Sequence, residues 1–313
     1  MWFASKEEEV RRIRDEGFAA LEARDFDGAI EKGRELLTMR WSGGFELIAL
    51  GLRAKGDHRG ALEALEDAAR VAPMWSLSQL RGNVLDELSR HADAVAAYDE
   101  ALALEGCWQG SVRYNRAVAN AALAQWGEAL ADAELALEDA RDAPFTMHAL
   151  RLAVESLGHL NRHEDAVKLI EHVAAGDGDA HLALSDIQVG AMLAAGRATT
   201  EIEALAQRAI EAHVAGLSVA RFLHRDGVSA KRVRARVVLR AAAPPNDHEG
   251  VIGAFRPATV RAKDEAEALA LLIALEPAAS RSEAALEVYE VLAEEEGPAE
   301  ILQLAGRIFF GAE

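Results

Sequence analysis

Histidine is the residue type in this 313-residue chain best suited to binding a metal ion, and ten histidines are present. His159 and His163 are four residues apart in "GHLNRHED", a spacing that on one helix face would bring two imidazoles together. The surrounding pattern instead places them on the turn between two helices, and His148, His172 and His181 are isolated. No His-Glu-x-x-His or Cys-x-x-Cys motif occurs. We therefore expect no metal site.

Carboxylates and a single cysteine are the other groups that could do chemistry. Runs such as Glu294–Glu296 contain neighbouring carboxylates, but charge runs of this kind are typical of solvated faces. The segment "GDGDAH" at 176–181 lacks the remaining ligands of a calcium loop. Cys107, beside Trp108 near a helix end, is better interpreted as a small hydrophobic residue than as a nucleophile. With no Gly-x-Ser-x-Gly or phosphate-loop motif, we expect neither an enzyme nor a cofactor.

The composition favours a helical, acidic, soluble protein. Half of the residues are hydrophobic but only 5% are aromatic, so alanine and leucine supply most of the apolar surface. The net charge is −18, and residues 1–220 contribute 22 basic and 37 acidic residues to it. An acidic surface of this kind repels nucleic acid and anionic lipid. A single cysteine, the lack of a signal-peptide pattern and the lack of a long apolar run predict a cytoplasmic protein without a membrane segment.

The chain repeats itself with a period near 34 residues. Small residues begin a helix after each polar turn, at spacings of 32, 33, 35 and 37 residues: Ala29, Ala61, Ala94, Ala129 and Ala166. Further positions recur seven residues after and twelve residues before each of them, and most of these are also small. Such periodicity predicts a solenoid of helix–turn–helix units, in which small side chains let antiparallel helices pack closely. Larger residues such as Leu85 and Tyr98 are expected to fill the seams.

At these residues the chain resembles the tetratricopeptide repeat (TPR) family. Residues 42–75 carry Ala49, Leu52, Ala61, Leu65, Ala68 and Pro73 at the positions of the family pattern, and residues 75–108 carry Gly82, Leu85, Ala94, Tyr98 and Ala101. Residues 110–143 are also close, whereas Gly33, Val154 and Val173 depart from the pattern in the outer repeats. The resemblance covers residues 10–180. It implies a mostly α fold, a right-handed solenoid of about six helix pairs over residues 1–216.

The resemblance also implies a partner-binding groove along the first helices of the pairs. Its residues in this chain are Arg53, Gln79, Asn83, Asp86, Tyr114, Asn115, His148 and Arg151. Asn83 and Asn115 match asparagines that hold a peptide backbone in the carboxylate-clamp members of the family. The lysines of that clamp are missing here, and Arg151 is displaced, so recognition of a terminal carboxylate does not follow. An asparagine amide can hydrogen-bond the backbone of an extended peptide. A solvated groove that binds no ligand is equally consistent with these residues.

The pattern changes after residue 216, where we predict a separate small α+β domain over residues 217–313. "KRVRARVVLRA" alternates, with Arg232, Arg234 and Arg236 on one side of a predicted strand and apolar residues on the other. "VIGAFRPATVRA" predicts a second strand of the same hairpin. A helix between Asp264 and Pro277 should follow, then a strand in "EAALEVYEVLAEE" and an edge strand in "GRIFFGAE". The domain loosely resembles tails of some bacterial TPR proteins.

Three functions remain for such a chain, and the first is favoured. It is a non-catalytic adaptor or scaffold that binds a protein or peptide partner in the groove. The alternative is an accessory subunit of a nucleic-acid-handling or defence complex, in which Arg232, Arg234 and Arg236 make a second contact. That strand lacks the interleaved aromatic residues that stack on bases, and its arginines could equally pair with acids in the same domain. An enzyme is the third, but no catalytic constellation supports it.

Overall fold

The computed structural model describes residues 2–140, 143–175, 184–212, 214–224, 230–242, 251–281, 283–305 and 308–311. The chain divides into two compact units, residues 1–160 and 161–313. The division falls on the turn between the two helices of the fifth predicted pair. The domain boundary predicted near residue 217 stays a prediction.

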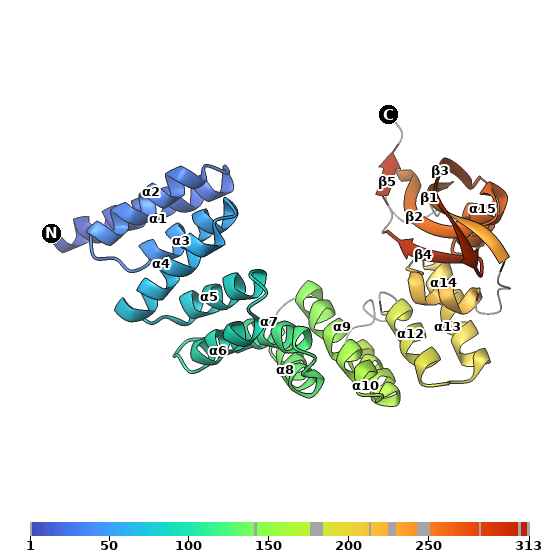
Figure 1. The fold of residues 1–313 in the computed structure, drawn as a ribbon, viewed down its shortest axis with the longest axis horizontal. Helices are drawn as coiled ribbons and strands as arrows, with labels where there is room; N and C mark the ends of the chain where they lie inside the picture. The colour runs from blue at the N-terminus through green and yellow to red at the C-terminus, as the bar shows by residue number, and fades with distance from the viewer. Residues whose placement is uncertain are drawn as a thin grey trace. The chain divides into compact units, whose positions relative to one another are not determined.

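The first unit is a series of helices joined by short turns (Figure 1). They are α1 (Trp2–Glu22), α2 (Phe26–Thr38), α3 (Gly44–Ala54), α4 (His58–Val71), α5 (Trp75–Glu87), α6 (His91–Leu102), α7 (Gln109–Ala122), α8 (Trp126–Glu138) and α9 (Ala143–His159). Each helix packs on the next, and the first helices α1, α3, α5, α7 and α9 also contact one another in order. This second set of contacts makes the helix pairs an array, because each first helix lies beside the next.

The turn inside each pair has a conformation that the sequence did not reveal. The residue two positions before the second helix has a positive φ, with values between 57° and 79°: Arg24, Gly56, Ser89, Ala124 and Asn161. These residues recur at the spacings of the alanine series. Only one of them is glycine, the residue that takes this conformation at no steric cost. The turn geometry is therefore imposed by the packing of the helix pairs.

The small residues of the repeat are buried as predicted. Ala29, Ala61, Ala94 and Ala129 are fully inaccessible and Ala166 is 2% exposed. The fifth repeat is offset by one residue from the prediction, because Ala153 is fully buried and Val154 is only half-buried. One residue turns a helix by about 100°, so the smaller side chain takes the position of closest approach.

Gly82 shows how close that approach is. A Cβ atom at this position would lie 2.3 Å from the ring of Tyr98, which is 1% exposed. Tyr98 on α6 thus packs directly on the backbone of α5, and Leu85 is buried beside it at 5% exposure. A glycine at the crossing point is required because the aromatic ring occupies the space of a side chain.

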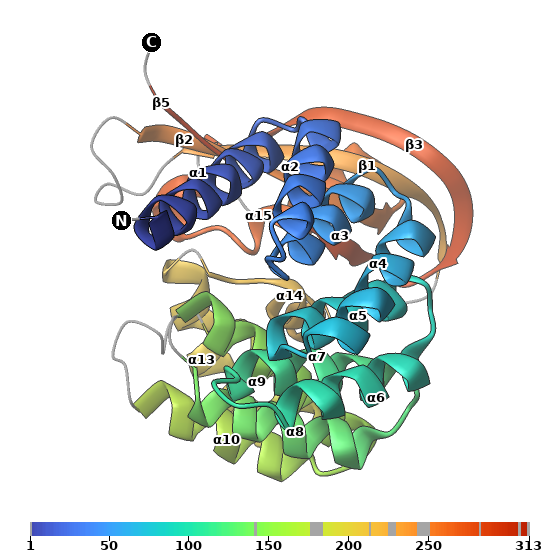
Figure 2. The ribbon, with the colours of Figure 1, turned by 90° about the vertical axis from the view of Figure 1, so that its left-hand side faces the viewer.

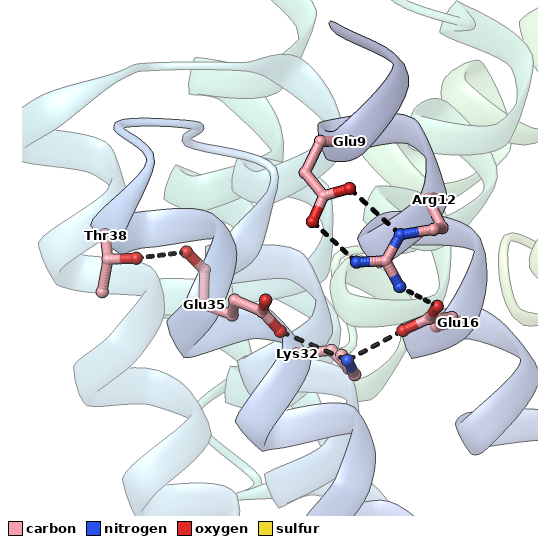
Figure 3. Close-up of polar contacts among 6 residues, drawn as sticks. All are labelled: Glu9, Arg12, Glu16, Lys32, Glu35 and Thr38. Atoms are coloured by element: carbon pink, nitrogen blue, oxygen red, sulfur yellow. Dashed lines mark hydrogen bonds and ion pairs between the residues drawn. The ribbon is translucent and has the colours of Figure 1, made fainter. Parts of the chain in front are cut away.

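Ion pairs join α1 to α2 on the surface of the first unit (Figure 3). Lys32 Nζ lies 2.8 Å from Glu16 Oε2 and 3.2 Å from Glu35 Oε2, and Arg12 bridges Glu9 and Glu16 along α1. All of these side chains are at least 30% exposed. Exposed pairs of this kind contribute about 0–1 kcal/mol each. The buried apolar residues Ile13 of α1, Leu36 of α2 and Leu47 of α3 therefore stabilise the packing of these helices more than the ion pairs do.

Among its described residues, the second unit begins with the helices α10 (His163–Ala175), α12 (Ser185–Ala194), α13 (Thr199–Glu211) and α14 (Leu217–Leu223). The first three extend the predicted series of pairs, and α12 packs on α13. Helix α14 was not predicted. Asp186 of α12 accepts hydrogen bonds from the backbone N–H groups of Gly216 at 2.8 Å and Val219 at 2.9 Å. This carboxylate caps α14 from a neighbouring helix, so no local pattern indicates it.

An antiparallel sheet completes the second unit. Its strands are β1 (Ala230–Ala242), β2 (Val251–Ala262), β3 (Ala285–Gly297), β4 (Glu300–Leu304) and β5 (Ile308–Gly311), in the order β3-β1-β2-β4, with β5 also paired to β2. Figure 2 shows β1, β2 and β3 as long, strongly bent strands. The predicted hairpin, third strand and edge strand are confirmed, whereas β4 was not predicted. Ala235, Val237 and Leu239 of β1 are fully buried.

Helix α15 (Glu265–Ile273) packs on the sheet and begins where the sequence predicted. Asp264 caps it by accepting a hydrogen bond from Glu267 N at 2.8 Å, and the short α16 (Ala278–Arg281) follows Pro277. The predicted fold class is therefore confirmed: a helical repeat array is followed by a small α+β region. No helix among the described residues combines the length and apolarity required to cross a membrane.

Candidate functional site

The inner face of α3, α5 and α7 carries polar residues that recur with the repeat. Gln79 Nε2 on α5 donates a hydrogen bond to Ser111 Oγ on α7 at 2.8 Å, and 32 residues separate the two. Asn115 Nδ2 on α7 donates to Asn83 Oδ1 on α5 at 3.0 Å, across the same separation. The repeats are 35 residues apart at this point, so each residue of α5 meets a residue of α7 about one turn before its repeat equivalent. The resemblance placed Gln79, Asn83 and Asn115 in a groove, and the structure brings Asn83 and Asn115 together.

A hollow of about 320 Å³ lies over these helices. Its lining residues come from α3, α5, α6 and α7 and are Arg53, Asn83, Asp86, Glu87, Tyr98, Tyr114, Asn115 and Val118. Five of the eight predicted groove residues are among them. Side chains that are up to 65 residues apart in the sequence thus converge on one concave site.

A second hollow of about 380 Å³ adjoins the first and is more apolar. It is lined by Leu21, Phe26, Leu50, Arg53, Ala54, His58 and Glu87. Arg53 and Glu87 line both hollows, so the two are neighbours, one with an apolar lining and the other with two asparagine amides. We call the residues of both hollows the channel.

An ion pair stands at the junction of the two hollows. Arg53 Nε donates to both carboxylate oxygens of Glu87, at 2.8 and 3.0 Å, and a further bond comes from Arg53 Nη2. The Arg53 guanidinium lowers the pKa of Glu87. His58 Nδ1 lies 3.1 Å from Glu87 without hydrogen-bond geometry. Both members of the Arg53–Glu87 pair are about one-third exposed, so the pair remains accessible to a ligand.

The carboxamide of Asn83 is held in one orientation by two donors. Tyr98 Oη donates to Asn83 Oδ1 at 2.9 Å, and Asn115 Nδ2 donates to the same oxygen at 3.0 Å. Burial raises the pKa of Tyr98, so its hydroxyl keeps its proton and remains a donor. This arrangement uses the acceptor of Asn83 and leaves Asn83 Nδ2 and Asn115 Oδ1 without a partner among the described residues. A donor and an acceptor are therefore fixed side by side in the channel.

Glu46 occupies the same face of α3 as Leu50 and Arg53, since the three are four and three residues apart. It is half-buried, and burial raises the pKa of its carboxyl group. No hydrogen bond or ion pair to Glu46 occurs within the described part of the chain. Asp86 differs, because its Oδ1 lies 2.6 Å from His91 Nδ1.

Three predicted groove residues lie outside the two hollows. Gln79 is bonded to Ser111, as described above, and Arg151 is exposed on α9. His148 on α9 faces Tyr114, with ring centroids 6.4 Å apart, and Phe145 meets the same tyrosine edge-on at 5.6 Å. His148 and Phe145 thus contact Tyr114, which itself lines the first hollow.

The channel also contains residues that the sequence interpretation missed. Leu50 lies 33 residues before Asn83, and Val118 lies 35 residues after it, so both occupy a repeat position already identified as a groove position. The repeat spacing was a sufficient signal for them. Glu87 has no such signal, because it lies one residue beyond Asp86 and enters the channel through its bond to Arg53.

The arginines of β1 make contacts that differ from those in the channel. Arg232 Nε donates to Glu267 Oε2 at 2.9 Å, and Arg236 Nη1 donates to Glu290 Oε2 at 3.0 Å. Arg234 pairs with Glu295. The three predicted second-contact residues thus have carboxylate partners inside their own domain, in keeping with the pairing that the sequence left open.

The candidate metal and nucleophile residues do not form a site in the described part of the chain. No group of three or more histidine, cysteine or acidic side chains there could hold a metal ion. His159 stacks on Trp126 with ring centroids 3.7 Å apart. Cys107 is half-buried against the core of the first unit and precedes α7, and burial raises the pKa of its thiol. The segment 176–183, with the acidic "GDGDAH" sequence, lies outside the described residues.

No family model matches the sequence, and no curated protein matches it. Similar solved structures include a TPR protein from Parabacteroides merdae, with 12% identity over 70% of this chain and 85% of that one and a TM-score of 0.49. MamA has 16% identity over 54% of this chain and 92% of its own, with a TM-score of 0.45. A thermophilic TPR protein from Thermus thermophilus has 28% identity over 46% of this chain and 77% of its own, with a TM-score of 0.37. The chain is similar to these TPR proteins, and its own structure is a helical repeat array followed by a small sheet region.

Proposed function

We propose that this protein is a non-catalytic adaptor whose channel binds an extended or helical segment of a partner protein. The observation that carries the proposal is the convergence of Arg53, Asn83, Asp86, Tyr114 and Asn115 on one hollow. These residues come from three successive first helices. The packing positions of the repeat are filled by other residues, so helix packing does not account for these polar side chains, apart from Asn83, which accepts from the buried Tyr98 hydroxyl.

The free groups of the channel suit a polypeptide. Asn83 Nδ2 is a donor for a backbone carbonyl, and Asn115 Oδ1 is an acceptor for a backbone N–H, so the pair can hold an extended chain whatever its sequence. The apolar hollow at Leu21, Phe26 and Leu50 offers burial for one large side chain of the partner. A segment that lies along the channel would use both hollows at once.

The alternative function, an accessory role on nucleic acid through Arg232, Arg234 and Arg236, has less support. Each of these arginines would have to leave a carboxylate partner before it could contact a phosphate. The chain is also strongly acidic, which opposes binding to nucleic acid. We propose that the C-terminal domain, predicted as residues 217–313, instead caps the array or adds a second protein contact.

The sharpest test is the substitution Asn83→Asp. It keeps the oxygen that accepts from Tyr98 and Asn115 but replaces the free donor by an acceptor. The affinity for a partner recovered with the parent protein should fall by about tenfold or more, since an unsatisfied buried polar group costs about 1–3 kcal/mol. Binding is measured by calorimetry with the purified partner.

The matched control is Gln125→Glu, which makes the same amide-to-acid change on an exposed turn before α8. It should leave the affinity unchanged. If Asn83→Asp folds and binds as tightly as this control, the channel does not bind the partner. The double change Asn83→Ala with Asn115→Ala tests the same point but also removes the acceptor of Tyr98.

A further inference from the structure

Strand β3 has an open outer edge. It lies at one end of the described sheet and spans 13 residues, whereas strands usually have about five or six. Its inner edge pairs with β1 along its whole length, from Ala285 to Gly297. No strand among the described residues pairs with its other edge. An open edge presents a row of backbone N–H and C=O groups that can pair with another chain.

The side chains of β3 are acidic and apolar. The strand contains five glutamates and no lysine, arginine or proline, the residues that most often protect an edge. Val288, Val291 and Leu292 are 42%, 54% and 43% exposed. The pairing with β1 skips Glu287 and Leu292, so regular pairing holds over Val288–Val291 between two bulges. The edge thus combines exposed apolar side chains with strong negative charge.

Strand β1 shows which kind of sequence pairs with β3. It alternates basic and apolar residues, and its arginines contact β3 carboxylates, with Arg236 on Glu290 at 3.0 Å and Arg240 on Glu287 at 2.5 Å. The same carboxylates stand beside the outer edge as well, because each strand residue neighbours both adjacent strands. A second copy of β3 would place five glutamates against five, which is unfavourable.

We propose that the outer edge of β3 binds an extended basic segment of a partner protein as an additional strand of the sheet. Backbone hydrogen bonds hold the segment, and specificity comes from basic residues opposite the glutamates. Val288, Val291 and Leu292 are covered by apolar residues of the segment. Glu294 and Glu296 make no ion pair with any side chain that the structure describes, so they are available to its basic residues. This site lies in the second unit and is independent of the channel.

The probe is an acetylated and amidated peptide with the sequence of residues 230–241, AKRVRARVVLRA. Its affinity is measured by fluorescence anisotropy, and the site is located by hydrogen exchange of the full chain. The peptide should slow exchange in residues 285–297, because its backbone pairs with the open edge. Two further peptides carry N-methyl groups on alternate residues. One is methylated at the odd positions and the other at the even positions, which we call the two phases. They keep the charge but lose half of the N–H donors.

The variant Val291→Lys with Glu294→Lys places positive charge on the edge and should weaken peptide binding by about fivefold or more. Its control, Glu203→Lys with Ala204→Lys, makes the same change in charge on the exposed surface of α13. The control and the channel variant Asn83→Asp should both leave peptide binding unchanged. This pattern separates failure of the edge site from failure of the channel.

Three results would overturn the proposal. The first is peptide binding with no slowing of exchange in residues 285–297, and the second is equal affinity of the parent peptide and the N-methylated peptides of both phases. Either result would mean that charge alone attracts the peptide to the protein. The glutamates and bulges of β3 would then serve only to keep its edge unpaired. The third is a dimer of the parent protein that protects β3, seen by analytical ultracentrifugation, because a second copy would then occupy the edge.

Discussion

The channel of the first unit and the sheet of the second unit use polar residues in opposite ways. In the sheet, Arg232 and Arg256 are bound by carboxylates of the same unit, Glu267 and Glu276. In the channel, Asn83 and Asn115 bind each other and still leave a donor and an acceptor free. The difference teaches that a polar cluster completed inside the protein acts on stability, whereas an incomplete one keeps groups free, which we propose serve a ligand. Each prediction below tests one side of this comparison.

The largest effect is expected at Arg256, which is 5% exposed and lies 3.3 Å from Glu276, itself 2% exposed. Its Nη2 also donates to the carbonyl of Ala215. Arg256→Met leaves the Glu276 carboxylate buried without this guanidinium, and breaking a buried pair in this way typically costs about 3–5 kcal/mol. Urea denaturation followed by circular dichroism should show this loss in the transition of the second unit.

The double change Arg256→Met with Glu276→Leu sharpens the result. Replacing both charges by apolar groups is often neutral or stabilising, so most of the lost stability should return. If the double variant is as unstable as Arg256→Met, the single effect came from lost packing or from the Ala215 contact. The pair would then not be a completed electrostatic cluster.

On the channel side, Gly82→Ala should destabilise the first unit by about 1–3 kcal/mol. The added Cβ would lie 2.3 Å from the buried Tyr98 ring, and this ring carries the hydroxyl that orients Asn83. Partner affinity should therefore fall together with stability. The matched control is Gly127→Ala on α8, where a Cβ meets nothing within 4 Å. This control should gain up to about 1 kcal/mol from helix propensity, as measured by thermal unfolding.

Sequence reasoning located the helix pairs because small residues at Ala61, Ala94 and Ala129 repeat a packing requirement at a fixed period. It missed features whose cause lies elsewhere in the chain. Helix α14 depends on a cap from Asp186, 30 residues before Gly216, and Ser89 and Ala124 adopt left-handed turns that their residue types do not favour. Local preference gives no signal for either, because tertiary packing decides both.

The candidate site was predicted in part for the same reason. The resemblance singled out Asn83 and Asn115 by their repeat positions, and both line one hollow in the structure. The sequence could not show that the two amides bind each other, since a hydrogen bond depends on the distance between α5 and α7. Arg151 was also expected in the groove; it is exposed on α9 and lines neither hollow, so its role there stays a prediction.

A smaller effect is expected at Glu267, which completes the sheet side of the comparison. Its carboxylate accepts from Arg232 and from the backbone N–H of Lys263 at 2.7 Å, and the Arg232 bond is the main cause of its lowered pKa. Glu267→Gln should cost about 1–2 kcal/mol at neutral pH. Because the folded pKa lies below the ordinary value of 4.5, this contribution is present above that value. It is lost as the pH falls through the folded pKa, so parent and variant should converge in acid.

The smallest effect has the opposite sign and concerns Glu46 in the first unit. Burial raises its pKa above 4.5 and no described group pairs with it, so the folded state binds its proton more tightly than the unfolded state. Stability contributed by this group therefore falls as the pH rises from 4.5 through the folded pKa, and then stays constant. Glu46→Gln should gain stability at neutral pH, by less than about 1 kcal/mol, and should flatten that slope.

Glu66→Gln, at an exposed glutamate of α4, is the control and should change little. Thermal unfolding between about pH 4 and 8 measures both. Equal behaviour of the two variants would mean that the Glu46 carboxylate is satisfied after all, and this face of α3 would then lack its unpaired charge.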